Sequence, residues 1–254
     1  MLFGIDTRAA KTVLYFARIQ LQRRYTGSWL GLAWSLLGPL TQIAAFSFVF
    51  NVVLRVPLDR YVLHMTAGFL PWLFMSTAIQ TASTAYVMRR DQIIHSSIPF
   101  SLFVIGTVLA EFFTLLVAFG ILLPLAAYWN GSIWWIYAIP IALLPCLVFA
   151  VAIGLVVARL TVFFRDIPHL LNVAFGLLFW FTPIVYHWSF LPEEAELVGK
   201  YNPMALLVSI NQVVWHGMQM PSLNLALGCA VVVGVSLLLE RWSRPLEKRL
   251  IFWL

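Results

Sequence analysis

The sequence predicts an all-α membrane protein, with six transmembrane helices in a single domain over residues 1–254. Of the residues, 62% are hydrophobic and 10% are charged, whereas roughly a quarter of the residues in a soluble domain are charged. The apolar runs are continuous, unlike the alternating segments of about ten residues in a transmembrane barrel. Several of them reach the length of about 20 residues that a helix needs to cross a bilayer.

The segment 7–24 is predicted to be a helix that lies at the membrane interface. At 100° per residue, apolar and basic side chains fall on separate faces, as in interfacial helices. A helix that merely packs on the bundle from the solvent side is the alternative. The apolar face is Ala10, Val13, Leu14, Ala17 and Leu21, and the other face is Arg8, Lys11, Tyr15, Arg18 and Gln22.

A glycine-rich corner follows this helix, and six apolar spans are then separated by polar segments. The segment 88–98 is too polar for lipid and long enough for a short helix. Residues 188–222 are too long for a simple connection and too mixed to span, which predicts short re-entrant periplasmic helices between spans five and six. The spans are expected at Trp29–Leu54, Tyr61–Val87, Pro99–Trp129, Ile133–Phe164, His169–Tyr186 and Leu223–Leu239.

The distribution of positive charge predicts the orientation. With six spans, both termini lie on one side, and thirteen of the 16 lysines and arginines fall on that side. The positive-inside rule therefore places both termini in the cytoplasm. The formal charge of +6 could suggest a nucleic-acid ligand. The basic residues cluster at the ends of the spans, however, as membrane topology requires, which argues against that function.

No catalytic or metal-binding motif is visible, so the chain is not expected to be an enzyme and no cofactor is expected in it. A phosphate-binding loop needs a Gly-x-x-x-x-Gly-Lys-Ser/Thr pattern. Lys200 is the lysine that follows a glycine, but Glu194 stands at the first glycine position and Tyr201 at the Ser/Thr position. Glu111 is the clear ionisable residue within a span. It is a candidate for function or for a structural pairing near the cytoplasmic boundary.

Aromatic residues form 15% of the chain. Many lie at span ends, where amphipathic rings favour the interface. Others lie deeper, where ring faces could offer sliding surfaces to a sugar chain, although lipid or core packing is the alternative for each ring. The predicted channel-lining aromatics are Trp34, Phe46, Phe50, Trp72, Phe74, Trp180, Phe181 and Tyr186.

These residues carry a resemblance to a known family. The chain resembles the permease subunits of ATP-binding-cassette exporters for polysaccharides and polyol phosphates, and the similarity spans nearly its whole length. The motifs that carry it are Arg24-Tyr25-Thr26-Gly27-Ser28, Leu30-Gly31, Trp34-Ser35, Pro39, Gly68, Leu70-Pro71-Trp72, Phe74, Phe164-Arg165-Asp166-Ile167, Phe179-Trp180, Thr182-Pro183-Ile184, Tyr186 and Asn202-Pro203.

The resemblance implies a homodimer of six-span subunits that carries two ATPase subunits, with ATP and Mg²⁺ bound by those partners. The segment 88–98 would couple to the ATPase through Arg89, Arg90, Asp91 and His95. Arg18, Arg23 and Arg24 would meet the anionic pyrophosphate of a lipid carrier, or serve only as positive-inside anchors. The full set expected at the substrate entrance is Arg18, Arg23, Arg24, Tyr25, Leu30 and Gly31.

The resulting expectation is a membrane subunit that exports a lipid-linked polysaccharide, O-antigen being favoured over capsule and teichoic acid. An exporter of drugs or simple lipids is one alternative, and its pathway would be apolar. A membrane anchor without transport activity is another. Such an anchor would stay an inert monomer.

Overall fold

The computed structural model describes residues 7–29, 31, 33–55, 57–95, 98–130, 139–186, 202–217 and 221–253. These residues form helices and connecting turns, with no strand among them. In the described part of the chain, five helices are long and apolar enough to cross a membrane. The prediction of an all-α, multi-pass membrane protein is therefore confirmed.

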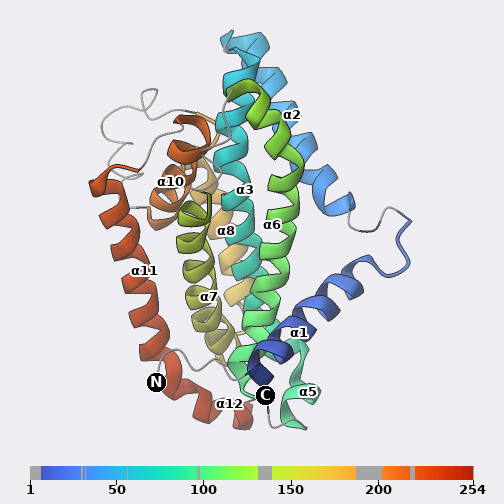
Figure 1. Ribbon diagram of the computed structural model, residues 1–254. Helices are drawn as coiled ribbons and strands as arrows, with labels where there is room; N and C mark the ends of the chain where they lie inside the picture. Colours follow the sequence, from blue (N-terminus) through green and yellow to red (C-terminus); the bar gives the residue numbers. More distant parts are fainter. Residues whose placement is uncertain are drawn as a thin grey trace.

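The helices follow the predicted order, with bounds shifted by a few residues (Figure 1). The five long helices are α2, α3, α6, α7 and α11. The elements are α1 (Thr7–Tyr25), α2 (Ala33–Leu54), α3 (Leu58–Ser83), α4 (Ala85–Met88), α5 (Arg90–Ile94), α6 (Phe100–Asn130), α7 (Ile139–Phe163), α8 (Ile167–Trp180), α10 (Pro203–Gly217), α11 (Leu223–Ser243), η3 (Arg244–Leu246) and α12 (Glu247–Trp253).

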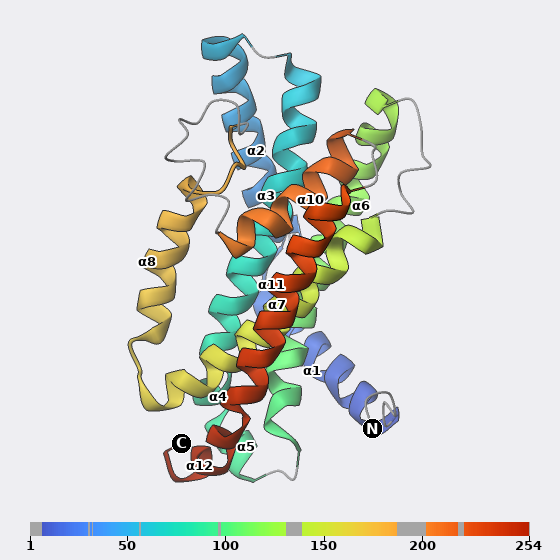
Figure 2. The same cartoon turned by 90° about the vertical axis from the view of Figure 1, so that its left-hand side faces the viewer.

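Helix α3 is the centre of the bundle. It contacts α2, α6, α7, α8 and α10, and the two views show it enclosed by these neighbours (Figures 1 and 2). The spanning segment of α3 has a mean hydropathy of 1.4, lower than the 2.9 of α7. A larger share of its residues is buried inside the protein, 72% against 56% for α7. Burial among protein neighbours is what allows polar residues in a spanning helix, because lipid offers them no hydrogen bonds.

Two segments differ from the sequence prediction. The fifth expected span, His169–Tyr186, is a helix of 14 residues that ends at Trp180, which at 1.5 Å per residue is about 21 Å long. Residues 181–186 are turns, because Pro183 cannot continue the hydrogen-bond ladder of the helix. The second expected span, Tyr61–Val87, is also interrupted before its predicted end, at Thr84 between α3 and α4.

Part of the expected re-entrant region, 188–222, lies outside the described residues. The part described is α10, a helix of 15 residues that contacts α3, α7 and α11. Its Trp215 is fully buried and stacks on Phe119 of α6 at 4.3 Å between ring centroids. The described part is therefore a short helix that packs on the bundle, and its re-entrant course stays a prediction.

Hydrogen bonds fasten the turn after α8 to α3 and α10. The Tyr61 hydroxyl donates to the Val185 carbonyl at 2.8 Å, and the Asn202 side-chain amide donates to the Thr182 hydroxyl at 2.8 Å. The Gln212 amide donates to the Pro183 carbonyl at 2.7 Å. The Thr182-Pro183 and Asn202-Pro203 motifs, far apart in sequence, are thus parts of one junction.

Replacing Gly68 of α3 with alanine is expected to lower the thermal unfolding midpoint of the purified protein in detergent. The added Cβ would lie 2.6 Å from Gln212 Nε2, the atom that bonds Pro183. Gly38→Ala in α2 is the control, because its Cβ meets nothing within 4 Å and alanine favours the helix by about 0.5–1 kcal/mol. A Gly68→Ala midpoint equal to that of Gly38→Ala would contradict this role of the junction.

Candidate functional site

The corner between α1 and α2 has the geometry that its glycines predict. Gly27 and Gly31 have φ angles of +80° and +49°, in the left-handed region that glycine adopts without strain. The Ser28 hydroxyl accepts a hydrogen bond from the Gly31 amide at 3.3 Å, and Trp29 is 97% exposed. The corner therefore presents an open, unpacked turn at the end of α1.

The predicted entrance residues are only partly visible here. Arg18 is exposed on α1. Arg23, Arg24 and Tyr25 belong to the last turn of α1, but their side chains lie outside what the structure describes, as does Leu30 entirely. Their role in meeting a substrate therefore stays a prediction.

The predicted coupling residues separate into two groups. Arg90, Asp91 and His95 are exposed on and just after α5. Arg89 is half-buried and reaches α1, where its guanidinium donates to the Gln20 side chain and lies 5.8 Å from the centre of the Phe16 ring. Arg89 thus connects the segment before α5 to the interfacial helix, while the other three side chains are accessible to a partner.

A groove of about 550 Å³ runs between α2, α3 and α8 and combines rings with polar side chains. Trp72 of α3 meets Phe175 at 5.7 Å and Phe179 at 6.1 Å between ring centroids. Polar residues of three helices complete its lining. They are Gln42, Ser76, Thr77, Gln80, Thr81 and Asn172.

Two buried polar atoms in this groove have no hydrogen-bond partner among the described residues. They are the indole Nε1 of Trp72, a donor, and Oε1 of Gln80, an acceptor. The Gln80 amide nitrogen is held by the Pro168 carbonyl at 2.7 Å. An unsatisfied buried group costs about 1–3 kcal/mol, and both atoms are covered in this structure rather than exposed to the groove. The polar character of the groove therefore comes from the other side chains of its lining.

The predicted channel aromatics do not form one surface. Trp72 lines the groove, and Phe46 and Trp180 contact Phe179 on its border. Trp34 and Phe74 line a different pocket, between α2, α3 and α6. Phe50 stacks on Tyr61 at 5.0 Å between ring centroids, and Phe181 is exposed. The Tyr186 hydroxyl donates to the Trp180 carbonyl.

The sequence prediction missed the α8 side of the groove and the polar row of α3. Phe175 and Phe179 were not among the expected lining residues, although their four-residue spacing places them on one face of a helix. Thr77, Gln80, Thr81 and Thr84 also recur at helical spacing. That pattern within an apolar span was the signal that could have found the row.

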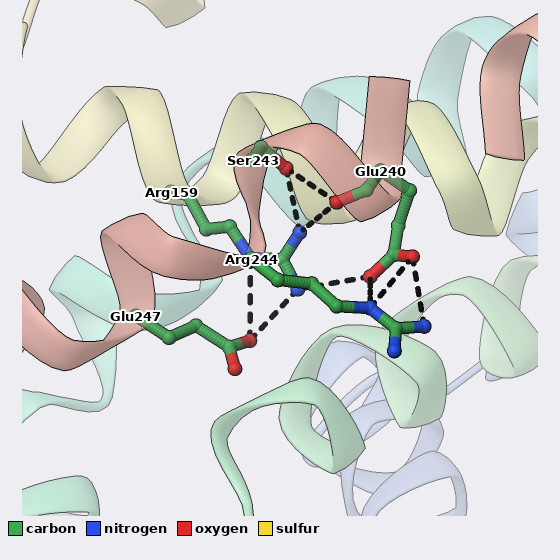
Figure 3. Close-up of polar contacts among 5 residues, drawn as sticks. All are labelled: Arg159, Glu240, Ser243, Arg244 and Glu247. Atoms are coloured by element: carbon green, nitrogen blue, oxygen red, sulfur yellow. Dashed lines mark hydrogen bonds and ion pairs between the residues drawn. The ribbon is translucent and has the colours of Figure 1, made fainter. Parts of the chain in front are cut away.

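A second missed feature is a buried ion cluster at the end of the bundle that carries α5 and α12 (Figure 3). Arg159 falls near the end of the fourth expected span, lies within α7 and is 1% exposed. Its guanidinium donates to Glu240 at 3.0 Å and to Glu247 at 2.8 Å, and to the Ser243 hydroxyl at 2.7 Å. Arg244, which is more exposed, pairs with the same Glu240 at 3.0 Å. Arg159 thus connects α7 to both α11 and α12.

Arg159→Met is expected to destabilise the protein strongly, because the variant removes the buried cation that bonds Glu240, Ser243 and Glu247. Breaking a buried ion pair from one side costs about 3–5 kcal/mol. The measurement is thermal unfolding in detergent, followed by tryptophan fluorescence.

Arg244→Met is the matched control for Arg159→Met. The Arg244 side chain is 65% exposed, and exposed pairs contribute little, so a small shift is expected. Equal shifts for the two variants would show that Arg159 does not hold the three helices together.

Fold and groove together define a class of protein: a multi-pass helical membrane protein whose central helix borders a cavity with polar and aromatic walls. No protein-family model matches the chain. An O-antigen export system permease protein RfbA of Myxococcus xanthus is 28% identical over 216 residues, 84% of this chain and 83% of the relative.

Two proteins of Klebsiella pneumoniae with the same name, O-antigen export system permease protein RfbA, are also similar. They are 26% and 25% identical over 190 residues, 74% of this chain and 73% of each relative. The resemblance to permease subunits of exporters, indicated by the sequence motifs, is thereby confirmed over most of the chain.

Proposed function

We propose that this chain is the membrane subunit of an ATP-driven exporter that moves a lipid-linked polysaccharide from the cytoplasm to the periplasm. The similarity to three O-antigen export permease proteins favours O-antigen as the polysaccharide. The membrane is the bacterial inner membrane, with both termini in the cytoplasm. In this arrangement α8 with its following turns completes six crossings and α10 is re-entrant.

The groove between α2, α3 and α8 is the single observation in the structure that supports this cargo best. Sugar units present hydroxyl groups at their edges and flat apolar faces to aromatic rings. Polar side chains of the lining, such as Gln42 and Asn172, supply hydrogen-bonding groups, and Phe175 and Phe179 supply rings. A drug or a simple lipid would make little use of the polar side chains of this lining, which disfavours that alternative.

A homodimer explains why the groove is open. Helix α8 has no buried residue, and only 11% of the spanning window of α2 is buried. A second copy related by a two-fold axis would place the same surfaces opposite one another. Two half-grooves would then enclose a channel wide enough for a hydrated chain.

ATP hydrolysis, with its Mg²⁺, is assigned to a separate ATPase subunit. The exposed Arg90, Asp91 and His95 at α5 offer charged contacts to such a partner. Arg89 would pass the motion on to α1 through Gln20 and Phe16. The interfacial helix and the corner that follows it would therefore respond to the state of the ATPase.

Purification of the chain together with its ATPase tests this function. We expect a complex with two copies of each subunit, and ATP turnover that rises with lipid-linked glycan but not with the carrier lipid alone. A single-copy protein that binds no ATPase would indicate the alternative of an anchor. Stimulation by apolar drugs in place of glycan would indicate the other alternative.

Replacing both Arg23 and Arg24 with alanine is expected to lower glycan export more than membrane insertion, because these cations would meet the pyrophosphate of the carrier. Export is measured in cells by surface glycan, and insertion by the amount of protein in the membrane fraction. The control is Lys248→Ala with Arg249→Ala, two exposed cations of α12. An equal loss of export and insertion in the Arg23 and Arg24 variant would show that the pair is only a topological anchor.

A further inference from the structure

A second pocket, of about 420 Å³, lies on the other side of α3 and is not explained by the groove. It is enclosed by the start of α2, the middle of α3 and α6, with Ser28 of the α1–α2 corner at its edge. Its volume is within the usual range for small-molecule sites. Leu73 and Thr77 line both this pocket and the groove, so the two cavities adjoin across one ridge of α3.

Glu111 of α6 lines this pocket and is 5% exposed. It lies eleven residues after Phe100, the first residue of α6, or roughly 16 Å along the helix axis. An ionisable side chain at such a depth is costly and marks a functional site by default. A carboxylate has about four acceptor positions on its two oxygens, so it can bind a ligand in addition to a protein donor.

The neighbouring hydroxyl groups add acceptors rather than donors. The Thr77 hydroxyl donates its proton to the Leu73 carbonyl at 2.7 Å, and the Thr114 hydroxyl donates to the Ala110 carbonyl at 3.2 Å. Each hydroxyl has one proton and two lone pairs, so the lone pairs remain for a ligand. With Glu111, this wall of the pocket therefore calls for a ligand that donates several hydrogen bonds.

Aromatic side chains form the other wall. Trp34, which is 58% exposed, and Phe74, which is buried, both line the pocket. A ring face next to a set of acceptors suits a molecule with an apolar face and hydroxyl groups around its edge. An acyl chain would cover the rings but would make no use of the acceptors that line this pocket.

We propose that this pocket is a sugar-binding subsite beside the entrance corner, in which Glu111 accepts hydrogen bonds from sugar hydroxyls and Trp34 covers the sugar ring. The inference rests on the proposed export of a glycan and adds a residue that selects it. From this subsite the sugar would pass over Thr77 into the aromatic groove. Glu111 thereby has a role in substrate recognition rather than in ion coupling.

Glu111→Gln tests the subsite in the complex with the ATPase, reconstituted in vesicles. The amide keeps the size of the side chain but loses the charge and replaces one acceptor oxygen with a donor. We expect the KM for lipid-linked glycan to rise about tenfold, as for the loss of one charge-assisted hydrogen bond, with a smaller change in kcat. Thr114→Val should raise KM in the same direction.

Thr107→Val is the matched control on the same helix. The Thr107 hydroxyl also donates to a backbone carbonyl, that of Phe103 at 2.9 Å, but Thr107 does not line the pocket. Its KM should equal that of the unmodified chain. A Glu111→Gln variant that lowers only kcat or thermal stability, with KM unchanged, would overturn the subsite.

A labelling experiment reads the pocket without transport. In a Ser35→Cys variant, whose new thiol lines the pocket, lipid-linked glycan should slow the reaction with maleimide, and this protection should disappear when Glu111→Gln is added. The carrier lipid without sugar should not protect. Protection by the bare carrier would assign the pocket to the lipid headgroup, and absence of protection in a complex that still exports glycan would refute the subsite while leaving the proposed function intact.

Discussion

The scarcity of water in a bilayer is the constraint on which this structure depends. Every polar group of a spanning helix must find a partner within the protein or within a cavity. Helix α3 carries the polar row at Ser76, Thr77, Gln80 and Thr81, and it is the helix enclosed by most of the others. Most of these hydroxyls bond backbone carbonyls one turn earlier on the same helix, so they remain compatible with a helix while offering lone pairs to a cavity.

The same constraint accounts for the two ends of the bundle. At one end the amides of Asn202 and Gln212 tie α10 to the turn after α8. At the other end Arg159 gathers two carboxylates and a hydroxyl from α11 and α12. Between these polar junctions, small residues allow α3 and α7 to approach closely, as at Gly154, where an added Cβ would lie 3.0 Å from Ala82.

Long apolar runs predicted the five principal helices because the cost of backbone polar groups in lipid leaves few other solutions. The glycine corner was also predictable, since Gly27 and Gly31 adopt angles that other residues avoid. The end of α8 at Trp180 was not predicted, because hydropathy continues through Phe181 to Val185 while the hydrogen-bond ladder does not. Hydropathy reports the preference of a segment for lipid. It says little about which hydrogen-bond partners the polar groups of that segment find.

The candidate site was only partly predictable for a similar reason. Composition showed that rings were abundant, but three-dimensional packing divides them between the groove, the pocket at Glu111 and the core. Arg159 falls near the end of the fourth expected span, and its partners lie more than eighty residues later. Pairing over that distance depends on how α7 and α11 lie side by side.

The weak attachment of α2 has a consequence for biosynthesis. This helix leaves the ribosome before the rest of the bundle, with a mean hydropathy of 1.7 and few buried residues, so it can rest in lipid alone. Helix α3 follows with a more polar surface and acquires its full set of neighbours only when α6, α7 and α10 have been made. During translation α3 therefore needs temporary shelter, from the insertion machinery or from α2, until its later partners arrive.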